Sequence, residues 1–547
     1  MKERCVLIVM ALMSAWLVQL GGLGASPARA DDPRSVFYSF NGDGAADLAI
    51  GVPYEDTDVL ASVGAVNVLY GTRAGGLEAT GDQIWHQDSS GVPDTAEAGD
   101  QFGRALALGD FNADTYLDLA VGIPYEDIDD DTNTGAVYVQ YGGAGGLSAT
   151  GDQFWHQDVA TADGPVQNVN EDEDYFGYAL AVGDFNADGY ADLAIGVPGE
   201  DAVAANQGAV NVLYGSSHGL TTASNQQWRQ DSTNVEDTAD AGDQFGYSLA
   251  AGDLNGDGYD DLAIGVPYED VSGVDRAGAV NVLYGGAFGL SASNDQFWHQ
   301  DSPGVADSLE ALDMFGTSLT TGDFNADAYV DLAVGVPWEN LGAPEVDHGV
   351  VHVLYGSASG LSAAGSQLWH QNISGVLDTA EQGDAFGFAL AAGDFDGDTF
   401  DDLAISVPYE DVDAMSSAGA VNVLYGTPGG LSASGDQFWH QDVTTINDSC
   451  EAGDGFGYAL AAGDFNQSGQ ADLAIGIPFE DVGAIADAGA VAVIYGSRNG
   501  LTDSGDEFWH QDSTNVEGMA EADDHFGFAL ASGGIRYPLF VPQVIKQ

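Results

Sequence analysis

FGYSLAAGDLNGDGYDDLAIGVPYED, residues 245–270, is the stretch of sequence that decides the fold. It opens with a Phe-Gly pair that recurs in the same context at intervals of 69 to 74 residues. A fixed period of this size indicates a repeat array or a propeller. The pairs in register begin at Phe102, Phe176, Phe245, Phe315, Phe386, Phe456 and Phe526.

Each repeat contains four short segments rich in β-branched and aromatic residues and separated by Gly, Pro, Asn and Asp. In the repeat quoted above they are residues 245–251, 261–267, 278–285 and 296–301. No window shows a long apolar period of 3.6 residues, so strands are expected rather than helices. The array therefore predicts an all-β fold, a seven-bladed β-propeller whose blades are four-stranded antiparallel sheets. Alternating Ala and Gly on the first two strands suits the crowded inner part of such a ring.

The two ends of the array predict how the ring closes. The first acidic loop, Ser39–Asp47, has only a stub of a strand before it, whereas the last Phe-Gly unit, Phe526–Ser532, has no acidic loop after it. We expect the C-terminal strand to supply the inner strand of the first blade, which closes the ring and removes its open edges. The last strands of the seven blades are marked by Trp85, Trp155, Trp228, Trp298, Trp369, Trp439 and Trp509.

A nine-residue acidic loop, Asp253–Asp261 in the quoted repeat, carries the chemistry. Oxygen-bearing side chains stand at its first, third, fifth and ninth positions, and the seventh residue can offer its backbone carbonyl. Ca²⁺ takes six to eight oxygen ligands, and a tight loop can aim these groups at one point. Flanking strands and the lack of a Glu at the twelfth position exclude an EF-hand. The five complete sets are Asp110, Asn112, Asp114, Tyr116 and Asp118; Asp184, Asn186, Asp188, Tyr190 and Asp192; Asp253, Asn255, Asp257, Tyr259 and Asp261; Asp323, Asn325, Asp327, Tyr329 and Asp331; and Asp394, Asp396, Asp398, Phe400 and Asp402.

Two further loops are incomplete. Ser39 replaces the first carboxylate of one loop, and Ser468 replaces the fifth-position Asp of the other. For these loops weaker Ca²⁺ binding and a plain turn both remain open. Their remaining candidate ligands are Asn41, Asp43 and Asp47 in the first loop and Asp464, Asn466 and Asp472 in the last.

The Phe-Gly pair, the Asp-rich loop and the following Gly-Val-Pro with its acidic residues resemble FG-GAP repeats, the units of the integrin α-chain propeller. The resemblance covers residues 36–533 in seven copies. It implies a seven-bladed propeller with Ca²⁺ in the hairpin loops between the first two strands of blades. No leg region, transmembrane helix, cytoplasmic tail or inserted domain of an integrin α chain is recognised, so an integrin-type heterodimer is not implied.

The composition restricts the partners. Residues 1–30 read as a secretory signal peptide, with Lys2 and Arg4 before an apolar run and Ala28–Ala30 as a cleavage site. Its removal leaves 8 of the 11 Lys and Arg and 85 of the 86 Asp and Glu, a formal charge of −77. Such a surface repels nucleic acid and anionic lipid and attracts cations. Seven Ca²⁺ would supply only 14 positive charges, so either further cation binding or a need for solubility must explain the remaining acidity.

Residues 31–533 are therefore expected to form the propeller, and residues 534–547 an apolar, basic tail for sorting, docking or packing on the first blade. Once the signal is removed, Cys450 remains alone, so no internal disulfide is expected. The Trp-His-Gln-Asp strand ends suggest sugar or metal sites, but packing is favoured, and Arg229 replaces one His.

No catalytic motif is recognised, so the chain is not expected to be an enzyme. The sequence predicts a secreted or cell-surface calcium-binding propeller, adhesion-like, that binds an extracellular protein or matrix ligand and has no transmembrane segment. The alternatives are a multivalent carbohydrate-binding lectin, whose ligand would be a glycan, and a propeller module of a hydrolase system.

Overall fold

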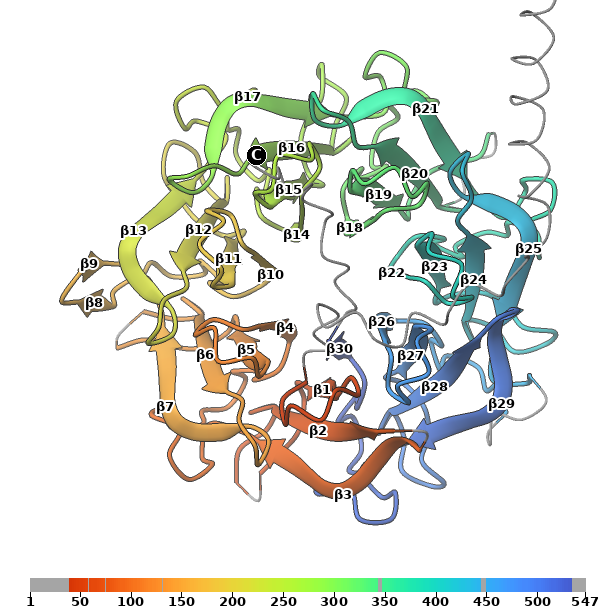
Figure 1. The fold of residues 1–547 in the computed structure, drawn as a ribbon, viewed down its shortest axis with the longest axis horizontal. Coiled ribbons are helices and arrows are strands. Elements are labelled where there is room, and N and C mark those ends of the chain that lie inside the picture. The colour runs from red at the N-terminus through yellow and green to blue at the C-terminus, as the bar shows by residue number, and fades with distance from the viewer. Residues whose placement is uncertain are drawn as a thin grey trace, which may run out of the picture. The chain divides into compact units, whose positions relative to one another are not determined.

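The computed structural model describes residues 39–533 apart from residues 58, 74, 130, 343–346 and 444–448. The predicted signal peptide and C-terminal tail lie outside the described residues. Within the described part, strands and turns form seven four-stranded antiparallel sheets and one small hairpin. The prediction of an all-β, seven-bladed propeller is confirmed (Figure 1).

Each sheet has an inner strand near the ring centre, followed outward by a second, a third and an outermost strand. The inner strands of blades 1 to 7 are β30 (Ala529–Ser532), β4 (Ala105–Gly109), β10 (Leu180–Gly183), β14 (Ser248–Gly252), β18 (Ser318–Gly322), β22 (Leu390–Gly393) and β26 (Ala459–Gly463). The second strands are β1 (Leu48–Val52), β5 (Asp118–Ile123), β11 (Asp192–Val197), β15 (Asp261–Val266), β19 (Asp331–Val336), β23 (Asp402–Val407) and β27 (Asp472–Ile477).

The two outer layers of strands complete the blades. The third strands are β2 (Ala65–Thr72), β6 (Ala136–Tyr141), β12 (Ala209–Tyr214), β16 (Ala279–Tyr284), β20 (Val350–Tyr355), β24 (Ala420–Tyr425) and β28 (Ala490–Ser497). The outermost strands are β3 (Gly76–Trp85), β7 (Ser148–Trp155), β13 (Thr221–Trp228), β17 (Ser291–Trp298), β21 (Ser362–Trp369), β25 (Ser432–Trp439) and β29 (Gly500–Trp509). The extra hairpin is β8 (Ala160–Thr161) with β9 (Gly164–Pro165).

The C-terminal strand closes the ring as predicted. β30 pairs antiparallel with β1 in the register Leu48 with Ser532 and Gly51 with Ala529. Each inner strand contacts the inner strands of both neighbouring blades, including β30 with β4 and with β26. The first and last repeats of the chain are therefore joined within one sheet, and no blade is left with an open edge at the seam.

The outermost strands were predicted with wrong limits. β17 begins at Ser291 and ends at Trp298, whereas the sequence suggested residues 296–301. Its first half is polar and partly exposed, because it lies at the outer edge of the sheet, so it lacks the apolar run used to recognise the other strands. A register shift between Val282 and Tyr284 accommodates the bend between its two halves. His299, Gln300 and Asp301 belong to the turn that follows.

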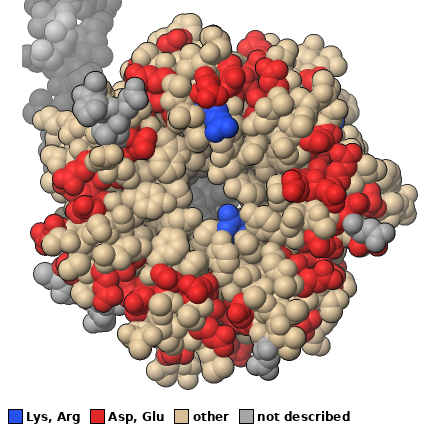
Figure 2. Space-filling view, turned by 180° about the vertical axis from the view of Figure 1, so that it is seen from behind, with Lys and Arg blue, Asp and Glu red and all other residues tan. Residues whose placement is uncertain are grey.

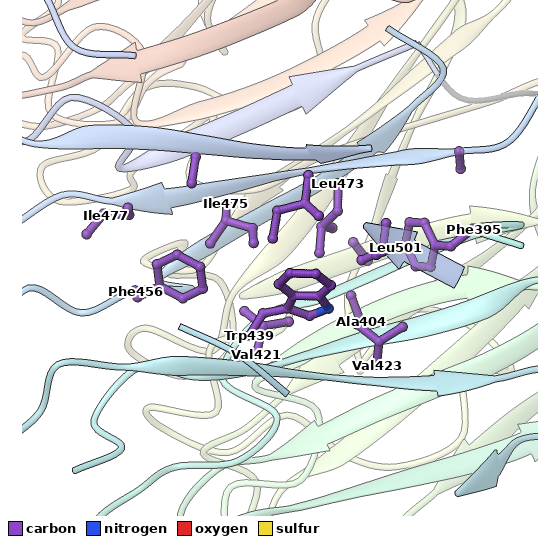
Figure 3. Close-up of a cluster of buried hydrophobic side chains, with 14 of the residues drawn as sticks. Phe395, Ala404, Val421, Val423, Trp439, Phe456, Leu473, Ile475, Ile477 and Leu501 are labelled. Carbon is purple, nitrogen blue, oxygen red and sulfur yellow. The ribbon is translucent and has the colours of Figure 1, made fainter. Parts of the chain in front are cut away.

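The hydrophobic core lies between the blades. In the cluster of Figure 3, Trp439 and Val421 of blade 6 pack against Leu473 and Ile475 of blade 7. Small residues let neighbouring blades come close near the ring centre, as predicted: a Cβ added to Gly122 in the second strand β5 would lie 2.1 Å from the carbonyl oxygen of Gly177 in the next blade. Stability therefore comes from contacts between consecutive repeats rather than from a core within each one.

His352 in β20 gives the fold a specific dependence on pH. Its side chain is buried, with its ring centroid 5.4 Å from that of Phe315. Burial lowers the pKa of His352 from 6.5 to about 3. The unfolded chain therefore takes up a proton below pH 6.5 that the folded chain does not bind, so stability falls as the pH drops below this value.

Replacing His352 with Asn should remove this acid sensitivity. Asn281 and Asn422 occupy the same place in their blades and donate to the backbone carbonyls of Glu236 and Leu377, so the substitution is already accommodated by the fold. Between about pH 7 and pH 5 the native chain should lose roughly 2 kcal/mol more unfolding free energy than the His352→Asn variant. Urea unfolding at both pH values measures the difference, and equal losses would contradict the assignment.

Candidate functional site

The predicted acidic loops are the tight hairpins that join each inner strand to the second strand. Residues 110–118, for example, connect β4 to β5. In blade 1 the loop leads only into β1, because β30 comes from the far end of the chain. All seven loops therefore lie at the same end of their blades and share one face of the ring.

The loop between β4 and β5 is folded around its own side-chain oxygens. The carboxylate of Asp110 accepts backbone N–H bonds from Asp114 at 3.0 Å and from Thr115 at 2.8 Å. Asn112 Oδ1 accepts from Asp114 N at 2.8 Å, and Asp114 Oδ1 accepts from Tyr116 N at 3.0 Å. The other four complete loops repeat the two bonds to the first residue and the bond to the fifth.

The backbone of these loops is strained at two positions. Ala113 and Thr115, the fourth and sixth residues of their loop, have φ of 55° and 77°. Left-handed backbone costs a residue with a Cβ about 1–2 kcal/mol. This backbone conformation accompanies a tight turn in which the side chains of the first, third and fifth residues accept N–H bonds from within the loop.

The ninth-position Asp has a structural role that the sequence did not reveal. Asp118 is fully buried, and its two carboxylate oxygens accept backbone N–H bonds from Phe111 and Gly142, both at 2.9 Å. It thus ties the hairpin to the end of the third strand. Burial raises the pKa of Asp118 to about 8 even though these bonds favour the charged form. The same pair of bonds is made by Asp47, Asp192, Asp261, Asp331, Asp402 and Asp472.

The oxygens of the complete loops fit a hard cation. In blade 6 one carboxylate oxygen from each of Asp394, Asp396 and Asp398 lies within 4.8 Å of the others. The other four complete loops have Asn at the third position, which provides a carbonyl oxygen in place of a carboxylate. An all-oxygen set of carboxylates and carbonyls is the set preferred by Ca²⁺. The ligand role of these residues, and of the seventh-position carbonyl, remains a prediction.

The two incomplete loops keep the same shape with fewer charges. Ser39 Oγ donates to Asn41 Oδ1 at 3.3 Å and accepts from Gly44 N at 3.4 Å, so it replaces part of the bonding of the missing Asp. In the last loop Ser468 Oγ accepts from Gln470 N at 3.3 Å. The loop fold therefore does not require the full set of carboxylates.

Backbone hydrogen bonds join the seven loops into a ring. In each loop the N–H of the eighth residue donates to the carbonyl of the first residue of the preceding loop. The bonds run from Leu117 to Ser39, Ala191 to Asp110, Asp260 to Asp184, Val330 to Asp253, Asp401 to Asp323, Ala471 to Asp394 and Ala46 to Asp464. A change in one loop therefore acts directly on its neighbours.

The opposite ends of the blades carry a second ring of contacts, which the sequence interpretation missed. The Gln two residues after each of the seven Trp residues donates its Nε2 to the Glu that follows the second strand of the next blade, at 2.5 to 2.8 Å; this Glu is buried in every blade except blade 1, where Glu55 is half-buried. The pairs are Gln87 with Glu126, Gln157 with Glu200, Gln230 with Glu269, Gln300 with Glu339, Gln371 with Glu410, Gln441 with Glu480 and Gln511 with Glu55. The available signal was that Gln is kept in all seven repeats, including the repeat in which Arg229 replaces His.

The Trp of the same strand ends packs between blades, in agreement with the favoured interpretation. Trp155, Trp369 and Trp439 are buried in interblade clusters. Five of the seven residues that follow the Phe-Gly pairs are aromatic, and several of them are in contact across blades. Arg104 lies 4.7 Å from the ring centroid of Phe528, which is 5.0 Å from that of Tyr458. Acidic side chains gather in patches around the face shown in Figure 2.

Six segments of the chain match the model of the FG-GAP repeat. They are residues 102–139, 176–213, 245–283, 315–354, 386–424 and 456–494. Each segment begins at a Phe-Gly pair and ends at or within the third strand of its blade, so each contains one complete acidic loop or, in the last, the loop with Ser468.

Curated relatives match parts of the chain. Integrin alpha-PS2 of Drosophila melanogaster is 33% identical over 48% of this chain and 17% of its own length. Integrin alpha-5 of Xenopus laevis is 30% identical over 43% of this chain and 20% of its own. Phosphatidylinositol-glycan-specific phospholipase D of Rattus norvegicus is 33% identical over 30% of this chain and 19% of its own length. The matches thus span a fifth or less of these relatives.

The relatives include both integrin chains and an enzyme, so the expectation that this chain is not an enzyme stays a prediction. Among the described residues there is no helix that is long and apolar enough to cross a membrane. The closed ring of seven blades, the six matched repeats and the similarity to integrin α chains all indicate the same family. The chain is therefore an FG-GAP repeat protein, built as a seven-bladed propeller that resembles that of the integrin α chains.

Proposed function

We propose that this protein is a secreted or cell-surface propeller that binds Ca²⁺ in its hairpin loops and uses the resulting rigid ring to bind an extracellular protein or matrix ligand. The observation that carries the proposal is the set of five complete acidic loops on one face, each folded around converging oxygens. The integrin relatives support an adhesion-like role. Calcium acts here as a structural ion that neutralises the clustered carboxylates.

Removing calcium should lower the melting temperature. A site filled at about a hundred times its dissociation constant stabilises the fold by about 2.7 kcal/mol. Five such sites in a chain of this size correspond to a shift on the order of 10 °C. Calorimetry of the chain without residues 1–30, in millimolar Ca²⁺ and in EDTA, measures the shift.

A matched variant tests whether the hairpin loops cause the shift. It carries Asp→Asn at the exposed fifth position of the five complete loops, which removes one carboxylate from each loop and keeps the side-chain oxygen that accepts the backbone N–H. This variant should lose most of the difference between Ca²⁺ and EDTA. An equal melting temperature of the native chain in both buffers would remove hairpin calcium from the proposal. The substituted residues are Asp114, Asp188, Asp257, Asp327 and Asp398.

The partner is tested separately. The native chain and the fifth-position variant are immobilised in Ca²⁺ and exposed to the proteins of the native surroundings, and each captured protein is purified and its dissociation constant measured. An adhesion-like role predicts at least one purified partner that binds in Ca²⁺ and is released by EDTA. If instead a glycan array shows many weak identical sites, the multivalent lectin is the better function.

The phospholipase relative supports the hydrolase alternative, because 19% of the length of that enzyme is similar in sequence to this chain. In that case this chain would act as the non-catalytic module of a hydrolase system. Such a module would bring a co-purifying hydrolase activity in the capture experiment, which the adhesion-like role does not predict.

A further inference from the structure

Three residues join each blade to the next where the third strand ends, in what is called here the Tyr–Gln–Leu contact. Between blades 4 and 5, Tyr284 Oη donates to Gln296 Oε1 at 2.5 Å. The backbone N–H of Leu361 donates to both of these oxygens, at 3.3 and 3.0 Å. Gln296 Nε2 donates in return to the carbonyl of Leu361 at 3.0 Å. One side-chain amide thus pairs both the N–H and the carbonyl of a buried residue in the neighbouring blade.

The amide bond to the Leu carbonyl is present at all six interfaces between consecutive blades. Its length is 2.9 to 3.0 Å in every case, so the six contacts are equivalent. The pairs are Gln83 with Leu147, Gln153 with Leu220, Gln226 with Leu290, Gln296 with Leu361, Gln367 with Leu431 and Gln437 with Leu501.

The seventh interface, between blades 7 and 1, departs from this pattern. Its Tyr and Leu are Tyr495 and Leu77, but Glu507 stands where the other six interfaces have Gln. The Leu77 N–H donates to Tyr495 Oη at 3.4 Å, as at the other interfaces. Here β29 and β3 meet, where the two ends of the array complete the ring (Figure 1). A carboxylate has no N–H, so Glu507 in its charged form cannot donate to the Leu77 carbonyl.

The hydrogen bonds of Glu507 are those of an acceptor alone. Tyr495, Leu77 and Trp509 all donate to it, and the bond from Trp509 Nε1 to Glu507 Oε2 is 2.9 Å long. In blade 4 the corresponding bond, from Trp298 to the Gln amide oxygen, is longer, at 3.4 Å. In the remaining five blades the buried indole Nε1 has no partner; these residues are Trp85, Trp155, Trp228, Trp369 and Trp439.

A second acid stands at the same interface. Glu78 follows Leu77, at a position where the other six blades have Ser or Thr. Burial raises the pKa of Glu507 and the charge of Glu78 on β3 adds to this, while the three hydrogen-bond donors act in the opposite direction. Tyr495 on β28 stays protonated, because burial raises its pKa and the charge of Asp472 on β27 contributes. Glu507 is therefore the group at this contact that changes its charge in the acidic range.

We propose that Glu507 makes the interface between blades 7 and 1 a pH-sensitive contact, which is more stable when the carboxyl group is protonated than when it is charged. A protonated carboxyl has one acceptor oxygen and one O–H. It can therefore accept from Tyr495 and the Leu77 N–H and donate to the Leu77 carbonyl, as the Gln amide does elsewhere.

The direction of the pH dependence follows from proton binding. Because the pKa of Glu507 is raised, the folded chain binds this proton more tightly than the unfolded chain. The added stability is fully present below pH 4.5, the ordinary value for Glu, and is lost as the pH rises through the raised pKa. At neutral pH the ring therefore opens first at this interface.

Hydrogen exchange measured by mass spectrometry follows the opening of each interface separately. The native chain and Glu507→Gln are compared at the same pH, so that the intrinsic pH dependence of exchange cancels in their ratio. At about pH 7.5, β3 and β29 should exchange about tenfold faster in the native chain, since the Gln amide restores one hydrogen bond to a buried carbonyl. At about pH 4.5 the two chains should exchange at nearly equal rates.

Two outcomes of this comparison would overturn the proposal. If β3 and β29 exchange no faster in the native chain at about pH 7.5, the acid does not weaken the interface. If the difference has the same size at both pH values, the carboxyl group does not titrate in this range. The exchange of β17 and β21, which belong to the contact between blades 4 and 5, should be the same in both chains.

The matched variant Gln296→Glu should transfer the behaviour to the interface between blades 4 and 5. That contact also has an indole donor, Trp298, and Ser362 stands there in place of the second acid. At about pH 7.5, β17 and β21 should exchange about tenfold faster than in the native chain, with no change in β3 and β29. Unchanged exchange of β17 and β21 would show that the amide bond does not control an interface, and the proposal would be wrong.

Discussion

A chain truncated after Gln511 should lose most of its thermal stability. The truncation removes β30, which supplies the inner strand of blade 1 through its pairing with β1. It also removes Phe526, a fully buried member of the cluster between blades 7 and 1. Gln511 and its bond to Glu55 stay in the truncated chain. Because one edge of β1 is then unpaired, the ring is open at the seam and the melting temperature should fall by roughly 10 °C or more.

Two further chains separate closure from other effects of the truncation. Removing only residues 534–547 keeps β30 and should leave the melting temperature nearly unchanged. Phe526→Ala keeps the strand but empties its place in the core, at a cost of about 3–5 kcal/mol. Calorimetry of the three chains in the same buffer gives the order of effects. Closure by the C-terminal strand would be contradicted by a truncated chain as stable as the one that lacks only residues 534–547.

Asp118→Ala and Asp114→Ala should have different effects although both residues stand in one acidic loop. Asp118 is buried and holds the N–H groups of Phe111 and Gly142, so its loss leaves two backbone donors unpaired. At about 1–3 kcal/mol for each donor, Asp118→Ala should cost roughly 2–6 kcal/mol in EDTA as well as in Ca²⁺. Asp114 is exposed, so its loss should cost less than about 1 kcal/mol in EDTA.

In Ca²⁺ the Asp114→Ala chain should lose the stabilisation from one bound ion, about 2.7 kcal/mol at a hundredfold excess over the dissociation constant. Urea unfolding of both variants in the two buffers measures all four values. Asp47→Ala in the incomplete first loop is the matched control for the structural role, since Asp47 makes the same two backbone bonds. Equal effects of Asp114→Ala in EDTA and in Ca²⁺ would show that this loop holds no stabilising ion.

The blades could be predicted from the sequence because the same pattern of residues recurs in every repeat. The Phe-Gly pair, the acidic loop and a second-strand segment such as Asp261–Val266 each occur seven times, so the fold and its closure by β30 were predicted correctly. The limits of β17 were wrong because its first half is polar and partly exposed, and a half-exposed strand has no strong apolar pattern.

The site was predicted less completely for a different reason. Spacing within one loop showed which oxygens are close, but the role of Asp118 depends on Gly142, which lies 24 residues further along the chain. The contact between Gln300 and Glu339 joins two blades and has no local sequence signature. Buried acids such as Asp313 read as solvated loop residues until the neighbouring blade is present.

The pairing of β30 with β1 also determines when the protein can finish folding. Gly51 and Ala529 are partners in one sheet, yet nearly the whole propeller is synthesised between them. A contact of such high sequence separation is slow to form, because a very long loop must close first. As the chain emerges from the ribosome, blades 2 to 7 can assemble in order while β1 waits with an unpaired edge. During that interval a second chain could offer its own β30, so a strand-exchanged dimer is the characteristic misassembly of this architecture.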